Sequence, residues 1–122
     1  MPGMRLVLLA SLLFAGCSAT LTSTQINQPP APMFRRSPES VELFTSGPPL
    51  RPHTDVAVLE AQSGLDARST GELIGLLRTK AGAQGCDGLV VTAVQTHISR
   101  YEERKTVTGT CIVYPPTAVA SP

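Results

Sequence analysis

Three cysteines and two histidines are the residues of this 122-residue chain that could perform redox or metal chemistry: Cys17, Cys86, Cys111, His53 and His97. Paired thiols form disulfides in an oxidising compartment, whereas thiolates and imidazoles together bind zinc. The last four of these residues lie 33, 11 and 14 positions apart in chain order, which matches no compact ligand pattern such as C-x-x-C. We therefore predict no metal site and no cofactor, and keep a site built from Cys86, Cys111, His53 and His97 as the alternative.

Cys17 stands at the end of a segment that is typical of export signals. One basic residue precedes an apolar run, residues 6–14. This run is too short for the roughly 20 residues of a membrane-spanning helix but suits the core of a signal peptide. Ala15 and Gly16 then provide a small-residue cleavage site directly before Cys17, as in bacterial lipoprotein signals. We expect residues 1–16 to be removed and Cys17 to be lipidated; an ordinary signal peptide, with Cys17 incidental, is the alternative.

Lipidation of Cys17 would decide both the location of the protein and the number of cysteines left to form a disulfide. Two or three acyl chains on one residue give a stable membrane anchor. Ser18, in place of an aspartate, would by resemblance direct the lipoprotein to the outer membrane. Cys86 and Cys111 then remain as an even pair beyond the cytosol, and we predict a disulfide between them.

The position of that disulfide in the fold is left open by the sequence. An antiparallel hairpin that places Cys86 opposite Cys111 must turn at Ile98 and Ser99, whereas the polar run between the strands centres nearer Tyr101. A bulge or an offset would reconcile the two, or the last strand pairs elsewhere in the sheet.

Charge and motifs argue against nucleic-acid binding and enzyme activity. The chain has ten Lys and Arg residues against nine Asp and Glu; loss of Arg5 with the signal leaves nine of each, a formal side-chain charge of zero. Binding of nucleic acid requires a clustered basic surface. Ser63 lies in Ala-Gln-Ser-Gly-Leu, which lacks the first glycine of the hydrolase motif G-x-S-x-G. We therefore predict no nucleic-acid partner and no catalytic residues.

Composition divides the mature chain into three parts. Residues 17–40 begin with small and hydroxylic residues and continue into a proline-containing stretch, which predicts a lipid anchor followed by a stiff tether. Arg35 and Arg36 near its end are expected to be solvated. Residues 41–115 have the composition of one small domain, and residues 116–122 that of a disordered tail.

The domain is expected to contain four strands and one helix. Strands are predicted at 41–45, 55–61, 89–94 and 107–114, with a solvated hairpin loop over 97–105.

The helix has the clearest signal. Ser69 and Glu72 form a capping box, and Gly85 suits a left-handed C-cap. Apolar residues at helical spacing (Leu73, Leu76, Leu77 and Ala81) lie on one face between these caps. The order strand, strand, helix, strand, strand predicts an α+β domain with the helix packed across a small sheet.

This layout resembles the RcsF-like family, the outer-membrane lipoprotein sensors of the Rcs envelope-stress phosphorelay. The similarity rests on Cys17, the proline-containing tether, the strand Val-Glu-Leu-Phe-Thr-Ser at 41–46, the helix segment Leu-Leu-Arg-Thr-Lys-Ala at 76–81, and the ending Thr-Cys-Ile-Val at 110–113. The resemblance implies a sensor anchored in the outer membrane that acts through protein partners, an outer-membrane barrel or an inner-membrane regulator. In that family the cysteine at the position of Cys111 is bonded to a cysteine that follows the second strand. Here Cys86, which follows the helix, would replace that partner.

The same order of elements and the run Asp-Gly-Leu-Val-Val at 87–91 are also similar to the wider YbjQ-type superfamily of small oligomeric domains. This second resemblance implies a small ligand-binding or structural envelope domain. The two interpretations differ in what they require of the tether. A sensor should lose function when residues 18–40 are shortened, whereas a structural domain that assembles through its strand edges should tolerate the change.

Overall fold

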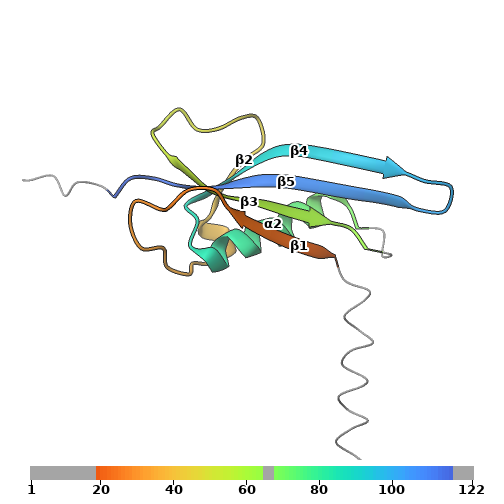
Figure 1. The fold of residues 1–122 in the computed structure, drawn as a ribbon, viewed down its shortest axis with the longest axis horizontal. Helices are drawn as coiled ribbons and strands as arrows, with labels where there is room; N and C mark the ends of the chain where they lie inside the picture. Colours follow the sequence, from red (N-terminus) through yellow and green to blue (C-terminus); the bar gives the residue numbers. More distant parts are fainter. Residues whose placement is uncertain (1–18, 65–67, 117–122) are drawn as a thin grey trace, which may run out of the picture.

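In the computed structural model, which describes residues 19–64 and 68–116, a five-stranded mixed sheet carries one helix on one side (Figure 1). The elements are β1 (Thr20–Gln25), the short 3-10 helix η2 (Pro38–Ser40), β2 (Glu42–Phe44), β3 (Thr54–Gln62), α2 (Thr70–Gln84), β4 (Gly88–Ile98) and β5 (Glu103–Val113). Their order across the sheet is β1-β3-β5-β4-β2, and β2 pairs parallel with β4 while all other neighbours are antiparallel. The predicted α+β class is confirmed.

The expectation of a free tether over residues 17–40 is wrong for a large part of that segment. Thr20 to Gln25 pair with Gln62 to Ala57 as an edge strand, and the following residues 26–41 cross to β2 at the opposite edge of the sheet. We call residues 26–41 the strap. The domain therefore begins at β1 rather than at residue 41. The predicted signal peptide, Cys17 and residues 117–122 of the predicted tail lie outside the described residues.

The core lies between α2 and the facing side of the sheet. Leu73, Leu77 and Ala81 of the helix are fully buried, as their helical spacing predicts. They pack with the inward side chains of the three central strands, which include Ala57, Leu59, Ala61, Leu89, Val107 and Cys111. On the other side of the sheet, Pro48 and His53 of the β2–β3 loop, residues 45–53, line a small pocket together with Val90, Thr92 and Thr110.

The predicted N-cap and C-cap of the helix are present, although the Glu72 carboxylate contacts the Ser69 hydroxyl, at 3.3 Å, instead of the Ser69 backbone amide. The Ser69 hydroxyl accepts a hydrogen bond from the Glu72 backbone amide at 3.1 Å. Gly85 ends the helix in the left-handed conformation, at φ 87°, where residues with a side chain are disfavoured.

The last two strands form a longer hairpin than the sequence indicates. β4 and β5 pair as far as Ile98 and Glu103, and the turn is closed by the Ser99 amide, which donates to the Glu102 carbonyl at 2.9 Å. The polar stretch 97–105 is therefore mostly strand, and the turn lies near Tyr101. The register shifts by one residue at Thr92. This shift is a β-bulge, one of the possibilities that the sequence left open for the hairpin. No helix within the described part of the chain is long and apolar enough to span a membrane.

Candidate functional site: the junction around the disulfide

The predicted disulfide is present and joins the exit of the helix to the central strand of the sheet. Cys86 directly follows the C-cap of α2, and Cys111 lies in β5. Their sulfur atoms are bonded at 1.99 Å, with 5.6 Å between the two Cα atoms, and both residues are fully buried. Cys111 pairs across the strands with Leu89 and Ala57, so Cys86 reaches it from the α2–β4 connection rather than from an opposing strand position.

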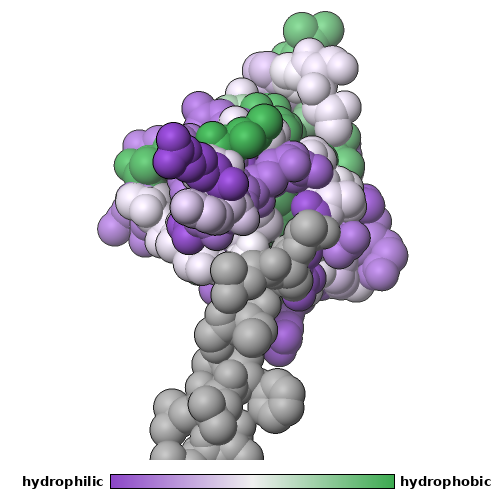
Figure 2. All heavy atoms as spheres, turned by 90° about the vertical axis from the view of Figure 1, so that its right-hand side faces the viewer, coloured by the Kyte–Doolittle hydropathy of each residue, from purple (hydrophilic) through white to green (hydrophobic). Residues whose placement is uncertain are grey.

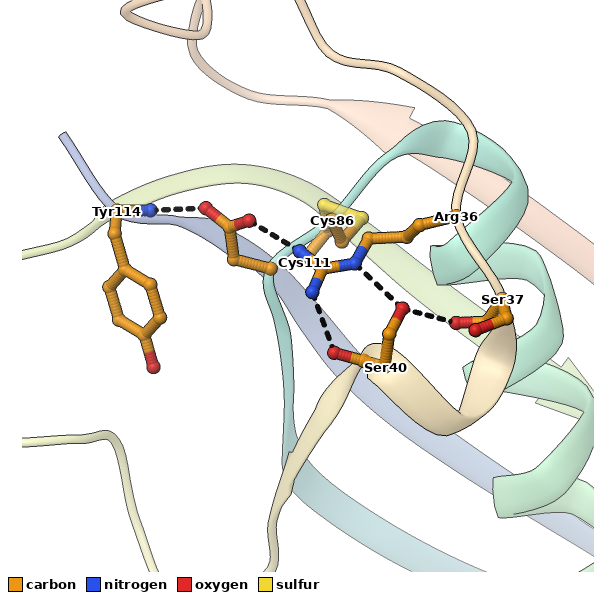
Figure 3. Close-up of polar contacts among 7 residues, drawn as sticks. Arg36, Ser37, Ser40, Cys86, Cys111 and Tyr114 are labelled. Atoms are coloured by element: carbon orange, nitrogen blue, oxygen red, sulfur yellow. Dashed lines mark hydrogen bonds and ion pairs between the residues drawn. A yellow bond between two sulfur atoms is a disulfide. The ribbon is translucent and has the colours of Figure 1, made fainter. Parts of the chain in front are cut away.

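Asp87, the residue after Cys86, connects four segments of the chain. Figure 3 shows Arg36, Tyr114 and the disulfide around it. Its backbone amide donates to the Ile112 carbonyl at 2.9 Å, and its carbonyl accepts from the Glu42 amide at 3.0 Å. Its carboxylate accepts a hydrogen bond from the Arg36 guanidinium at 2.6 Å and another from the Tyr114 amide at 2.8 Å. The sequence alone indicates no more than a turn residue at this position, so this role was missed.

Arg36 fixes the strap to the domain, which corrects the expectation that it is solvated. Besides Asp87, its guanidinium donates to the Ser40 hydroxyl at 2.9 Å and to the Ser40 carbonyl at 2.7 Å. Its backbone amide donates to the Gly82 carbonyl in α2 at 2.8 Å. Arg35, its neighbour, is exposed, as predicted. Arg36 thus holds the strap both to α2 and to Asp87, the residue before β4.

Two glycines at the end of α2 make this close approach possible. A Cβ atom on Gly82 would lie 2.7 Å from the Arg36 carbonyl oxygen, and one on Gly85 would lie 2.6 Å from that of Phe34. Side-chain carbon atoms do not reach such distances from backbone oxygens. Because both obstacles are backbone atoms of the strap, a larger residue at either position would displace it.

We expect Asp87→Ala to lower the free energy of unfolding by about 2 kcal/mol, since it removes an ion pair and leaves the Tyr114 amide without its acceptor. Arg36→Ala should lower the free energy of unfolding by about 1 kcal/mol, because the two side chains are about one third exposed and solvent weakens their attraction.

Urea denaturation of both single variants and the double variant measures the coupling energy between Arg36 and Asp87. Arg35→Ala is the matched control, with an expected change below about 0.5 kcal/mol; equal effects at Arg35 and Arg36 would contradict the assignment.

Tyr114 adds an aromatic side chain at the end of β5. The Arg51 guanidinium stacks over its ring, 3.4 Å from the centroid. Burial raises the pKa of the Tyr114 hydroxyl above its ordinary value, and the nearby Glu42 carboxylate raises it further. The phenol is therefore neutral at physiological pH. An open groove of about 360 Å³ lies between the strap and this end of β5, and the exposed ring of Phe34 lines it.

The alternative metal site is not assembled. Cys86 and Cys111 are bonded to each other, so neither sulfur is a free thiolate. His53 lies 3.5 Å from the Asp55 carboxylate, and its other ring nitrogen is 2.9 Å from the Arg51 carbonyl. Among residues 19–64 and 68–116, no three Cys, His, Asp or Glu side chains are grouped as metal ligands.

Ser63, the one serine in a hydrolase-like context, has a structural role. It is buried, its amide donates to the Lys105 carbonyl, and its hydroxyl accepts from the Lys105 amide, both at 2.9 Å. These two bonds extend the β3–β5 pairing by one step beyond Gln62.

Comparison with known proteins supports the fold alone. No known family matches the sequence, and neither does any curated protein. Among solved structures, the chain is similar to the crystal structure of the Francisella virulence factor FvfA, with a TM-score of 0.61 and 6% sequence identity over 81% of this chain and 100% of that one. The likeness places the α+β architecture among experimentally determined folds.

Proposed function

We propose that this protein is an outer-membrane lipoprotein, anchored through Cys17, that acts in envelope signalling by binding other proteins, in the manner of the RcsF-like sensors it resembles. It is not an enzyme in this proposal. The observation that carries the proposal is the buried Cys86–Cys111 disulfide. Such bonds are rare in the reducing cytosol and persist beyond it, which agrees with the export signal before Cys17.

The junction around the disulfide is the part of the surface that we propose for partner binding. Its charged groups, Arg36 and Asp87, hold the strap in place and also line the groove beside it. The strap in turn presents Phe34, which is 77% exposed, beside the groove. Exposed aromatic residues on a fixed backbone are typical anchors of protein interfaces.

The second candidate function, a small structural or ligand-binding domain of the YbjQ type, is favoured by one observation. β2 pairs with only the first three residues of β4, so the remaining length of β4 has one free edge within the described part of the chain. Such an edge accepts a further strand. Sedimentation analysis of the purified domain separates the two candidates, because the structural interpretation requires an oligomer.

Cys17→Ala tests the anchor. We expect the variant to lose incorporation of labelled palmitate and to leave the membrane fraction, since a chain without acyl groups has no stable attachment. The folded domain should remain intact, because Cys17 precedes its first strand. Mass spectrometry of the wild-type amino terminus gives the direct readout, and an unmodified Cys17 would refute the lipoprotein assignment.

Partner binding is tested by photo-crosslinking in cells with benzoylphenylalanine in place of Phe34, and in place of Leu50 as the control. Leu50 is fully exposed on the β2–β3 loop and does not line the groove. The proposal predicts defined protein adducts from position 34 that position 50 does not give. Deletion of residues 18–40 is unsuitable as a test, because it removes β1 and the Arg36 contacts and should unfold the domain.

A further inference from the structure

The β4–β5 hairpin extends beyond the rest of the sheet as a two-stranded arm (Figure 1). β3 pairs with β5 as far as Gln62 and Thr106, and the two Ser63–Lys105 bonds add one step, whereas β4 and β5 continue to Ile98 and Glu103. The paired part of the arm therefore projects two residues past the last row bonded to β3, or about 7 Å at the rise of a strand, and the turn lies beyond it.

The start of the described chain lies at the same end of the sheet. Thr20 pairs with Gln62, which pairs with Thr106, which pairs with Gln95, so these four residues form one row across the strands. Cys17 is three residues before Thr20, and three residues span at most about 10 Å. The reach of Cys17 is thus limited to about 10 Å from this row, at the same end of the sheet as the arm, and β1 and β4 are about 14 Å apart across three strand spacings.

The arm, and Val94 of β4 just before it, carry exposed apolar side chains that the helix does not cover. Val94 pairs with the buried Val107, so it lies on the core side of the sheet, and Ile98 follows on the same side. Val94 is 48% exposed, Ile98 76% and Tyr101, in the turn, 94%. Figure 2 views the molecule from this end and shows hydrophobic side chains between strongly hydrophilic ones.

Charged residues of both signs flank the apolar tip, with Glu102 and Glu103 between the basic residues. Arg100 lies between Ile98 and Tyr101 in the sequence, and Arg104 lies at the start of β5, where it is paired with Glu102 at 2.9 Å. Aromatic side chains next to arginine are characteristic of the membrane–water interface, where the ring meets the acyl boundary and the guanidinium meets lipid phosphates.

We infer that the tip of this arm, residues 98–101, is a second membrane contact that inserts Ile98 and Tyr101 into the interface of the leaflet holding the lipidated Cys17. This inference rests on the proposed lipid anchor. The anchor confines the domain to within a few residues of the bilayer, and the arm orients it. The domain then lies against the membrane, rather than being held away from it on a tether.

A single tryptophan tests the contact, because the natural chain contains none. Tyr101→Trp and, as the control, Leu50→Trp are prepared as full-length acylated protein in vesicles of phosphatidylethanolamine and phosphatidylglycerol (3:1), with and without brominated acyl chains. We expect brominated lipid to quench the Tyr101→Trp variant several-fold more than the Leu50→Trp variant, with a blue-shifted emission of the former only. Adding Ile98→Asp to Tyr101→Trp should reverse most of the quenching while leaving the thermal transition unchanged, since Ile98 is largely exposed.

Each result decides a different claim. Acylated protein that floats with the vesicles but shows equal, weak quenching in both variants overturns the membrane contact and leaves the anchor intact. Weak quenching together with a protein adduct from benzoylphenylalanine at position 101 in cells would identify the arm as a protein-docking element instead and also overturn it. An unmodified Cys17 in the mass spectrum of the same preparation removes the anchor, and the inference falls with it.

Discussion

Replacing both Cys86 and Cys111 by alanine is expected to lower the free energy of unfolding by about 3.5 kcal/mol or more. The two cysteines are 25 positions apart, so the bond closes a loop of 26 residues, and the chain-entropy relation for that length gives about 3.5 kcal/mol. Loss of two fully buried sulfur atoms adds a packing cost. For a domain of this size the melting temperature should fall by about 15 to 25 °C.

Circular dichroism melts of the oxidised wild type, the reduced wild type and the double variant measure this effect. Cys17→Ala is the matched control, because it removes the third cysteine without touching the bond. A reduced protein as stable as the oxidised one would show that the loop is already constrained by its strand pairing.

Gly82→Ala and Gly75→Ala are expected to change stability in opposite directions. At Gly82 the added methyl group meets the Arg36 carbonyl, so the strap must move and its hydrogen bond to the helix is lost, at a net cost of about 2 kcal/mol. At Gly75 nothing lies within 4 Å of the new atom, so the helix gains about 1 kcal/mol from the better propensity of alanine.

The pair is informative because both substitutions are identical and lie about two turns apart on one helix. If the m-value of urea denaturation is unchanged, the shift of the urea midpoint in each variant gives its change in the free energy of unfolding. Stabilisation by both variants would mean that the strap does not rest on Gly82 in solution. Combining Gly82→Ala with Arg36→Ala tests the link further, since the two losses should be less than additive if they act through the same contact.

The helix and the three central strands could be predicted from the sequence because their side chains have one buried side. Leu73, Leu77 and Ala81 recur at helical spacing between two capping residues. Cys111 was correctly paired with Cys86 from the cysteine count, although the register of the hairpin could not be derived, since the bulge at Thr92 leaves no mark in the pattern.

β1 could not be predicted from a hydrophobic pattern because it has almost none. All six of its residues are exposed, and only Leu21 among them is a large apolar residue. Its stability comes from backbone bonds to the edge of β3, which any sequence can make. Its three threonines are strong strand formers and were the available signal.

The junction around the disulfide could not be predicted from the sequence, because its contacts also leave no local pattern. The contacts of Arg36 join it to residues 46 and 51 positions away, Gly82 and Asp87, and no local pattern connects such residues. The prolines before it predicted a tether, yet here they shape a connection between opposite sheet edges. Gly82 carried the usable information, because a glycine within a helix is costly unless another backbone approaches it; Gly75 carries the same signal without such an approach.

The place of β5 in the sheet has a consequence for how the protein is made. This strand is synthesised after the other four, yet it lies at the centre, between β3 and β4, and holds the second half of the disulfide. If the polypeptide is exported from its amino terminus, as we propose, its first strands cross the inner membrane before their central neighbour arrives. The sheet can then close only after β5 has crossed, and a chain without the 11 residues of β5 would leave β3 and β4 without their shared neighbour and Cys86 without its partner.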